Sequence, residues 1–296
     1  MNSNVDKNFK LGIVYGLSAY FLWGIIPVYW KQIPHVSAFE ILANRFIWCV
    51  VFMLCLLVAT GSFKKLVEET KAVFSTVRTG FFMVLAAIVI TFNWGIFIWA
   101  VDAGRIVDTS MGYYINPLVS TLFGVVFFKE RLNTLEKIAV VCASIGIGIM
   151  VVQNGSLPWI SLSLALTFAS YGVFKKLLQV SALTSITIET LLIVPLALAY
   201  EYSLGSESQL VYGDFVTQAY LFGAGAATAI PLLLFTGCAK LMPLNFVGFL
   251  QYIAPTMTLF LGVFVYNEPF NMDRLLAFGC IWVGLVFFIW SQIRKL

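Results

Sequence analysis

Arg45 has the clearest capacity for chemistry in this sequence. It lies about seven residues into the apolar stretch 38–60, or roughly 10 Å along a helix that rises 1.5 Å per residue. Its planar guanidinium suits bidentate binding of a carboxylate or phosphate. We expect it to face a cavity, near Glu40 or Tyr114, and to bind an anionic small molecule. The alternative is a side chain that extends back to an outer polar interface.

Two glutamates are candidates for moving a proton or a charge. Glu40 shares a helix face with Asn44, because the two residues are four positions apart. Glu189 occupies the corresponding place in the second half of the chain. A carboxylate inside an apolar stretch is expensive and is often functional. The alternative for both glutamates is a position at a helix end, facing lipid headgroups.

Other polar and aromatic side chains interrupt the apolar stretches. Asn93 and Trp94 do so at 80–101, and the amide needs a partner, either another helix or a bound molecule. Trp23 precedes Gly24 in the first stretch and offers either a ligand contact or a close helix approach.

Two prolines mark a further candidate pocket. Pro117 and Pro255 each remove a helical hydrogen bond and predict bends at matching depths. The alternative is a purely structural bend. The polar groups beside these prolines, which we expect to bind substrate, are Tyr114, Asn116, Gln251 and Tyr252.

Signatures of enzymes and metal sites are missing from the sequence. There is no GxSxG, HExxH or P-loop motif. The chain has a single histidine, and its five cysteines form no CxxC pair. We predict no catalytic residue, no metal site and no cofactor. The basic residues gather in connections, so the net charge of +4 indicates membrane orientation and not nucleic-acid binding.

Composition determines the environment of these residues. The chain has 296 residues, of which 60% are hydrophobic and 11% charged, against about half and a quarter in soluble proteins. We predict an all-α polytopic membrane protein with ten transmembrane helices, the first retained and not cleaved, and long connections at 61–79 and 205–215. The expected spans are 11–30, 38–60, 80–101, 108–128, 134–152, 158–178, 184–203, 216–239, 244–265 and 272–293.

One stretch occurs twice, at a constant separation of 138 positions. Residues 114–146 and 252–284 align without a gap and share Tyr-Ile-x-Pro, a central glycine, a Glu-x-x-Asn joint and a Cys-x-x-x-Gly ending. A repeat this long indicates a duplicated domain. We predict two five-helix units, at 10–152 and 158–293.

The distribution of lysine and arginine predicts the orientation. With both termini in the cytoplasm, Lys31, Arg105 and Arg274 fall outside, Arg45 falls within a span, and the other basic residues fall inside. Five spans in each half then require the second unit to insert upside down. Inverted repeats of this kind are typical of secondary transporters.

These motifs resemble a known family. The duplicated unit with its P…G…E…G spacing resembles the EamA domain of the drug/metabolite transporter superfamily. The stretches NWGIFIWAV, GYYINPL and LQYIAPT resemble its RarD branch more narrowly. The resemblance covers about residues 10–293 and implies a multi-pass transporter of the bacterial inner membrane. It also implies a central cavity built from both halves, with the fifth and tenth helices outside it.

Three functions compete at this stage. The first is a transporter that moves a small polar or amphipathic metabolite, such as an organic anion, an amino-acid-like compound or a drug, by alternating access. The second is an intramembrane lipid-modifying enzyme, and the third is a structural membrane subunit. The repeat favours the first. The expected partners are a small-molecule substrate and the lipid bilayer; monomer and homodimer both remain open.

Overall fold

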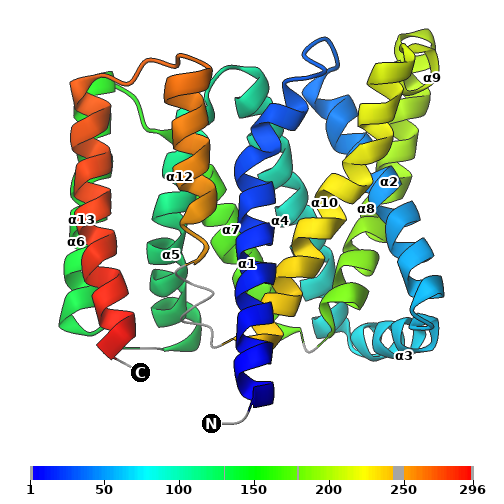
Figure 1. The fold of residues 1–296 in the computed structure, drawn as a ribbon, viewed down its shortest axis with the longest axis horizontal. Helices are drawn as coiled ribbons and strands as arrows, with labels where there is room; N and C mark the ends of the chain where they lie inside the picture. Colours follow the sequence, from blue (N-terminus) through cyan, green and yellow to red (C-terminus); the bar gives the residue numbers. More distant parts are fainter. Residues whose placement is uncertain (1–2, 130, 179, 243–249, 295–296) are drawn as a thin grey trace.

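The computed structural model describes residues 3–129, 131–178, 180–242 and 250–294, and its regular structure there is helical throughout (Figure 1). The elements are α1 Ser3–Trp30, α2 Ala38–Ala59, α3 Phe63–Phe74, α4 Val77–Asp102, α5 Ile106–Phe128, α6 Thr134–Asn154, α7 Trp159–Leu177, α8 Ala182–Leu204, η1 Gly205–Glu207, α9 Gln209–Tyr212, α10 Phe215–Leu241, α12 Ile253–Phe260, the π-helical η2 Leu261–Val265 and α13 Met272–Arg294.

Eight of the described helices are long and apolar enough to cross a membrane, namely α1, α2, α4, α5, α6, α8, α10 and α13. The expectation of an all-helical polytopic membrane protein is therefore confirmed. The stretch expected at 158–178 forms α7, a 19-residue helix that ends on two lysines. Of the stretch expected at 244–265, residues 244–249 lie outside the described chain, and the shorter apolar helix Ile253–Val265 follows.

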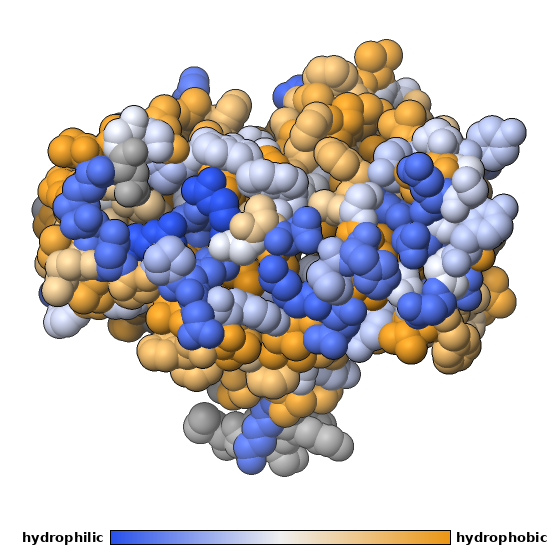
Figure 2. All heavy atoms as spheres, turned by 90° about the horizontal axis from the view of Figure 1, so that it is seen from above, coloured by the Kyte–Doolittle hydropathy of each residue, from blue (hydrophilic) through white to orange (hydrophobic). Residues whose placement is uncertain are grey.

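The surface of the bundle is apolar around its flanks. Large side chains such as Phe39, Phe92 and Val126 are about two-thirds exposed, at 66%, 64% and 70%. Figure 2 shows hydrophilic residues gathered in the middle of one end of the bundle, with hydrophobic residues around them. A water-soluble protein rarely exposes such continuous apolar area, so the flanks face lipid.

The connection at 61–79 contains α3, a helix that the sequence analysis treated as part of a loop. Its apolar residues recur at helical spacing, and Leu66 and Val73 are buried while Lys64 and Lys65 are exposed. A 12-residue helix is about 18 Å long, too short to span a bilayer. In Figure 1 α3 lies across the end of the bundle where both termini are found.

Helices α6 and α13 pack closely at one edge of the bundle (Figure 1). A Cβ atom at Gly146 would lie 2.7 Å from the carbonyl oxygen of Ala277, and one at Gly284 would lie 2.8 Å from that of Ala139. Only glycine permits approaches this close. The later residue of α6, Gly146, meets the earlier residue of α13, Ala277, and the reverse holds for Ala139 and Gly284, so the two helices are antiparallel. The two glycines are 138 positions apart, and so are the two alanines.

The two joints of the repeated stretch share their backbone conformation. Lys129 has φ of 56° and Asn267 has φ of 52°, and they are the non-glycine residues with positive φ in the described chain. Asn133 and Asn271 each accept a hydrogen bond from the amide three residues later, at 3.0 Å, as helix-capping asparagines do. Both pairs are separated by 138 positions.

Helices from the two halves of the chain alternate in their packing. Helix α1 packs against α10 and α12, while α7 packs against α4 and α5. Helices α2 and α8 pack against each other. In addition, α2 packs against α10, and α8 packs against α4. Helices α1 and α2 therefore both pack against α10, and α4 packs against α1 and α2. The candidate site lies among these four helices.

Candidate functional site

Arg45 lies in a box of side chains drawn from four helices. We call Arg45 of α2, Trp30 of α1, Trp94 of α4 and Thr228 of α10 the arginine box. The guanidinium carbon lies 4.4 Å from the ring centroid of Trp94 and 5.4 Å from that of Trp30. Nε donates a hydrogen bond to the hydroxyl of Thr228 at 3.0 Å, and that hydroxyl donates to the carbonyl of Ala224.

These contacts explain how a buried arginine is tolerated. Arg45 is 7% exposed, and an arginine at the centre of a bilayer costs about 2.5–3.5 kcal/mol on insertion scales. A desolvated cation–π contact offsets up to about 2 kcal/mol, and a hydrogen bond to a charged group about 1.5–3 kcal/mol. The box therefore holds the cation without a counter-ion, and within the described chain no carboxylate forms an ion pair with it.

The partners expected for Arg45 from sequence bind elsewhere. The Glu40 carboxylate accepts hydrogen bonds from the backbone amides of Gln209 and Leu210, at 2.5 and 3.2 Å. It thereby caps the short helix α9. The hydroxyl of Tyr114 bonds to Thr256 at 2.6 Å. Arg45 misses Glu40 because it lies five residues later, on a different side of α2.

Asn93 connects helices, which is the simpler of the two expectations for it. Its amide nitrogen donates to the carbonyl of Leu164 at 3.0 Å and to the hydroxyl of Thr167 at 2.9 Å, both on α7. Its carbonyl oxygen accepts from the hydroxyl of Tyr113 at 3.3 Å. Asn93 is fully buried. Its two bonds to α7 tie α4 to that helix at the residue immediately before Trp94.

Tyr114 and Tyr252, which correspond in the repeat, stack on each other. Their ring centroids are 6.3 Å apart, with planes inclined by 17°. The Tyr252 hydroxyl is buried without a hydrogen-bond partner. Asn116 accepts a bond from Ser120 at 3.4 Å, and Gln251 is half-buried. Within the described residues, no hydrogen bond or ring contact joins this pair to Arg45, so the expected residues form two groups.

The two prolines take different places in their helices. Pro117 lies in the middle of α5, which continues as one helix from Ile106 to Phe128. Pro255 lies in the first turn of α12, directly after the turn at Gln251 and Tyr252, where proline is readily accepted. Trp23 lies apart from both groups and contacts the rings of Tyr20 and Phe235.

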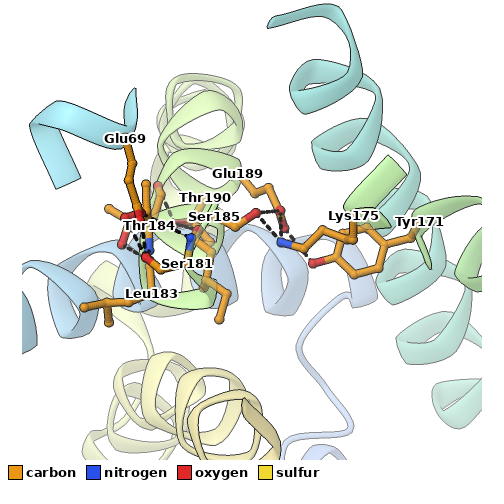
Figure 3. Close-up of polar contacts among 11 residues, drawn as sticks. Glu69, Tyr171, Lys175, Ser181, Leu183, Thr184, Ser185, Glu189 and Thr190 are labelled. Atoms are coloured by element: carbon orange, nitrogen blue, oxygen red, sulfur yellow. Dashed lines mark hydrogen bonds and ion pairs between the residues drawn. The ribbon is translucent and has the colours of Figure 1, made fainter. Parts of the chain in front are cut away.

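Glu189 is buried and forms an ion pair inside the protein. Its carboxylate accepts from the Lys175 ammonium at 2.7 Å, from the Tyr171 hydroxyl at 2.9 Å and from the Ser185 hydroxyl at 2.6 Å (Figure 3). It is 4% exposed. The alternative of a carboxylate facing headgroups is therefore wrong for Glu189. The network joins α7 to α8 on one side of α8.

A second carboxylate binds the start of α8. Glu69 of α3 accepts hydrogen bonds from the backbone amide and the hydroxyl of Ser181, at 3.2 and 2.6 Å (Figure 3). Burial acts to raise the pKa of Glu69, but the hydrogen bonds from Ser181 and Thr184 outweigh it and lower that pKa below its ordinary value. The ionised form of Glu69 thus holds α3 against α8.

At the end of the bundle opposite the termini, carboxylates connect the two halves. The Glu268 carboxylate accepts from the backbone amides of Ile106 and Val107, at 2.6 and 2.8 Å, where the dipole of α5 favours an anion. Asp108 pairs with Arg105 at 2.7 Å and with Arg274 at 3.5 Å. Glu40 makes a third connection through α9. Three contacts therefore join the two halves at this end.

Sequence reasoning missed two members of the arginine box. Trp30 stands at the end of its apolar stretch, where an interfacial aromatic is ordinary, and its buried indole N–H has no partner. Thr228 is a polar residue in the middle of an apolar stretch, three positions before Pro231. That position was a usable signal, but a threonine that bonds its own helix gives the same pattern.

The arginine box has an excess of hydrogen-bond donors. Within the described chain the two terminal amino groups of Arg45 have no hydrogen-bond partner, and neither does the indole N–H of Trp30. The charge of the guanidinium is uncompensated there. Such a site suits a ligand with a negative group and an apolar or aromatic body.

Comparison with solved structures gives the fold. One solved structure, described only as "Crystal structure of protein", aligns with a TM-score of 0.60 at 15% sequence identity, covering 96% of this chain and 97% of that chain. At this identity the likeness concerns the fold alone.

Comparison with curated proteins gives the family. The "Uncharacterized transporter YojE" of Bacillus subtilis is 42% identical over 96% of this chain and 95% of its own. The "Protein RarD" of Escherichia coli is 37% identical, covering 97% and 96%. The "Chloramphenicol-sensitive protein RarD" of Pseudomonas aeruginosa is 30% identical, covering 96% and 95%. The EamA-like transporter family matches residues 10–152. The chain belongs to the EamA-like transporter family, a family of transporters and not of enzymes.

Proposed function

We propose that this protein is a secondary transporter that moves a small metabolite bearing a carboxylate or similar anion across the bacterial inner membrane. The anion binds at the arginine box, and the two tryptophan rings contact the apolar part of the molecule. Both termini lie in the cytoplasm. The observation that carries this proposal is the buried cation of Arg45, which has donors to spare and no ion pair within the described chain.

The proposal includes an inverted repeat of two five-helix units, at 10–152 and 158–293. Its support is the set of matched positions that are 138 residues apart. The glycine contacts between α6 and α13 are reciprocal and antiparallel, both joints have one residue with positive φ, and the packing partners of α1 and α7 correspond. An inverted repeat allows one half to rock against the other around a site between them.

The closed end of the bundle supports alternating access. The contacts of Glu268, Asp108 and Glu40 join the halves opposite the termini. In the proposed cycle these contacts break when the site opens to that side, while Glu189 and Lys175 at the other end remain candidates for coupling a proton or a charge to the motion.

The test is transport by purified protein in proteoliposomes over a panel of organic anions and amino acids. Chloramphenicol is included because one relative carries it in its name. For any substrate found, Arg45→Lys is expected to lower initial uptake at least tenfold and Arg45→Ala to lower it further. Lysine keeps the charge but loses the planar fork and part of the stacking.

A matched control uses Arg78, which likewise lies over an aromatic ring, that of Phe82, but is exposed at the start of α4. Arg78→Lys is expected to leave uptake unchanged. Full uptake by both Arg45 variants at equal protein levels would show that the arginine only stabilises the bundle.

A further inference from the structure

A cavity lies away from the arginine box, between the amphipathic helix α3 and the transmembrane helix α8. Its volume is about 400 Å³, within the roughly 300–1,000 Å³ of small-molecule sites. We call it the α3 groove. Its lining residues are Leu66, Val67, Thr70, Lys71, Phe74, Ile188, Leu191 and Leu192.

The position of α3 places the α3 groove at the membrane interface. One side of α3 is held to the bundle by buried Leu66 and Val73 and by the hydrogen bonds of Glu69. The helix still exposes Phe63 and Phe74, at 52% and 48%. A helix with charged residues on one face and exposed aromatic residues on the other lies in the plane of the headgroups.

The lining of the α3 groove has an apolar body and a single charge. All but two of its residues are apolar, and the exceptions, Thr70 and Lys71, are adjacent on α3. Lys64 and Lys65 approach glutamates four positions later on the same helix, at 3.9 and 3.8 Å. No ion pair is found for Lys71 in the part of the chain described, so its ammonium is free to bind an anion at the groove.

We propose that the α3 groove binds one anionic phospholipid from the leaflet on the side of the termini. An acyl chain lies along Leu191 and Val67, and the phosphodiester contacts the ammonium of Lys71 and the hydroxyl of Thr70. This occupant satisfies both the apolar lining and the unpaired charge. A zwitterionic lipid brings the same chain but gains less from Lys71, because it has no net negative charge.

The test is native mass spectrometry of the full-length protein titrated with phosphatidylglycerol or phosphatidylcholine of equal chain length. The wild type is expected to retain one phosphatidylglycerol, several-fold more strongly than phosphatidylcholine. Lys71→Gln is expected to weaken phosphatidylglycerol roughly five-fold, since a lysine near an anionic surface contributes about that factor. Leu191→Trp, which fills the α3 groove, is expected to weaken both lipids.

The matched control is Lys64→Gln, whose side chain on the same helix is 91% exposed and outside the α3 groove. It is expected to bind like the wild type. Equal retention of the two lipids by the wild type, or equal losses in Lys64→Gln and Lys71→Gln, would overturn the proposal. So would unchanged binding in Leu191→Trp, or a dimer that this substitution breaks, because the groove would then hold a second copy.

Discussion

Glu268→Gln is expected to weaken a contact that joins the two halves at the end of the bundle opposite the termini, and so to favour opening there. The carboxylate of Glu268 accepts two backbone N–H groups of α5, at 2.6 and 2.8 Å, and it is 7% exposed. A glutamine side chain has the same shape but one acceptor oxygen, so its amino group would meet the second N–H group, a donor against a donor.

The size of the effect follows from that lost bond. A hydrogen bond to a charged group contributes about 1.5–3 kcal/mol, and Val107 or Ile106 would keep a buried N–H without a partner. The ratio of open to closed protein should therefore rise roughly 10- to 150-fold. The closed state remains the major one if the ratio of closed to open protein in the wild type exceeds this factor.

Native Cys49 provides the measurement. It is fully buried on α2 and packs against Ile186 of α8 and Ala229 of α10, so separation of the halves exposes it. A variant with Cys49 as its single cysteine is placed in nanodiscs and labelled with a maleimide. Labelling reports the fraction of open protein when opening and closing are fast.

Glu207→Gln is the matched control, because Glu207 lies near the same end but is exposed. We expect faster labelling in Glu268→Gln and unchanged labelling in Glu207→Gln. Equal labelling rates in the two variants would refute the assignment of Glu268 as a contact that closes this end.

Three further outcomes are expected. Cysteines at Lys129 and Asn267, both exposed, should label from opposite sides of the membrane, the second from outside; labelling from one side would refute the inverted repeat. Gly146→Ala should lower the melting temperature, because its Cβ would meet a backbone oxygen at 2.7 Å, whereas Gly148→Ala meets nothing within 4 Å and should not. Because the pKa of Glu69 is lowered, its hold on α8 is complete above the unfolded pKa of about 4.3 and is lost as the pH falls from there through the lower folded pKa, so hydrogen-exchange protection in α3 should fall on acidification, and less so in Glu69→Gln.

Eight of the expected spans are found as long apolar helices in the described chain, because apolar length alone decides what can cross a bilayer. Helix α3 was overlooked for the opposite reason. It is short, and its mixture of lysine, glutamate and apolar residues resembles a loop unless the helical period is examined. The boundaries of α2 at Ala38 and α13 at Met272 agree with the expected spans, since capping residues stand at both.

The candidate site was readable in part. Arg45 and Trp94 could be singled out because a charge and an interrupting aromatic are rare in an apolar stretch. Their meeting could not be foreseen, because it depends on how α2 and α4 are rotated in the bundle. The partner expected for Arg45 was the nearest carboxylate in the sequence, Glu40. The backbone amides at the start of α9 bind that carboxylate instead. Every residue type except proline has such an amide, so the sequence does not indicate which one will bind.

Two of the buried charged groups in the described chain, Glu189 and Arg45, differ in a way that bears on mechanism. Glu189 has a lysine at 2.7 Å and two hydroxyl donors, so its charge is balanced and its contacts are satisfied. Arg45 has two rings and one hydroxyl, which tolerate a cation but do not neutralise it. Breaking a balanced pair is costly, whereas an unbalanced cation gains energy when an anion arrives. An arriving anion therefore has more to gain at the arginine box than at Glu189, which makes Arg45 the better candidate for binding and Glu189 the better candidate for holding two helices together until the bundle moves.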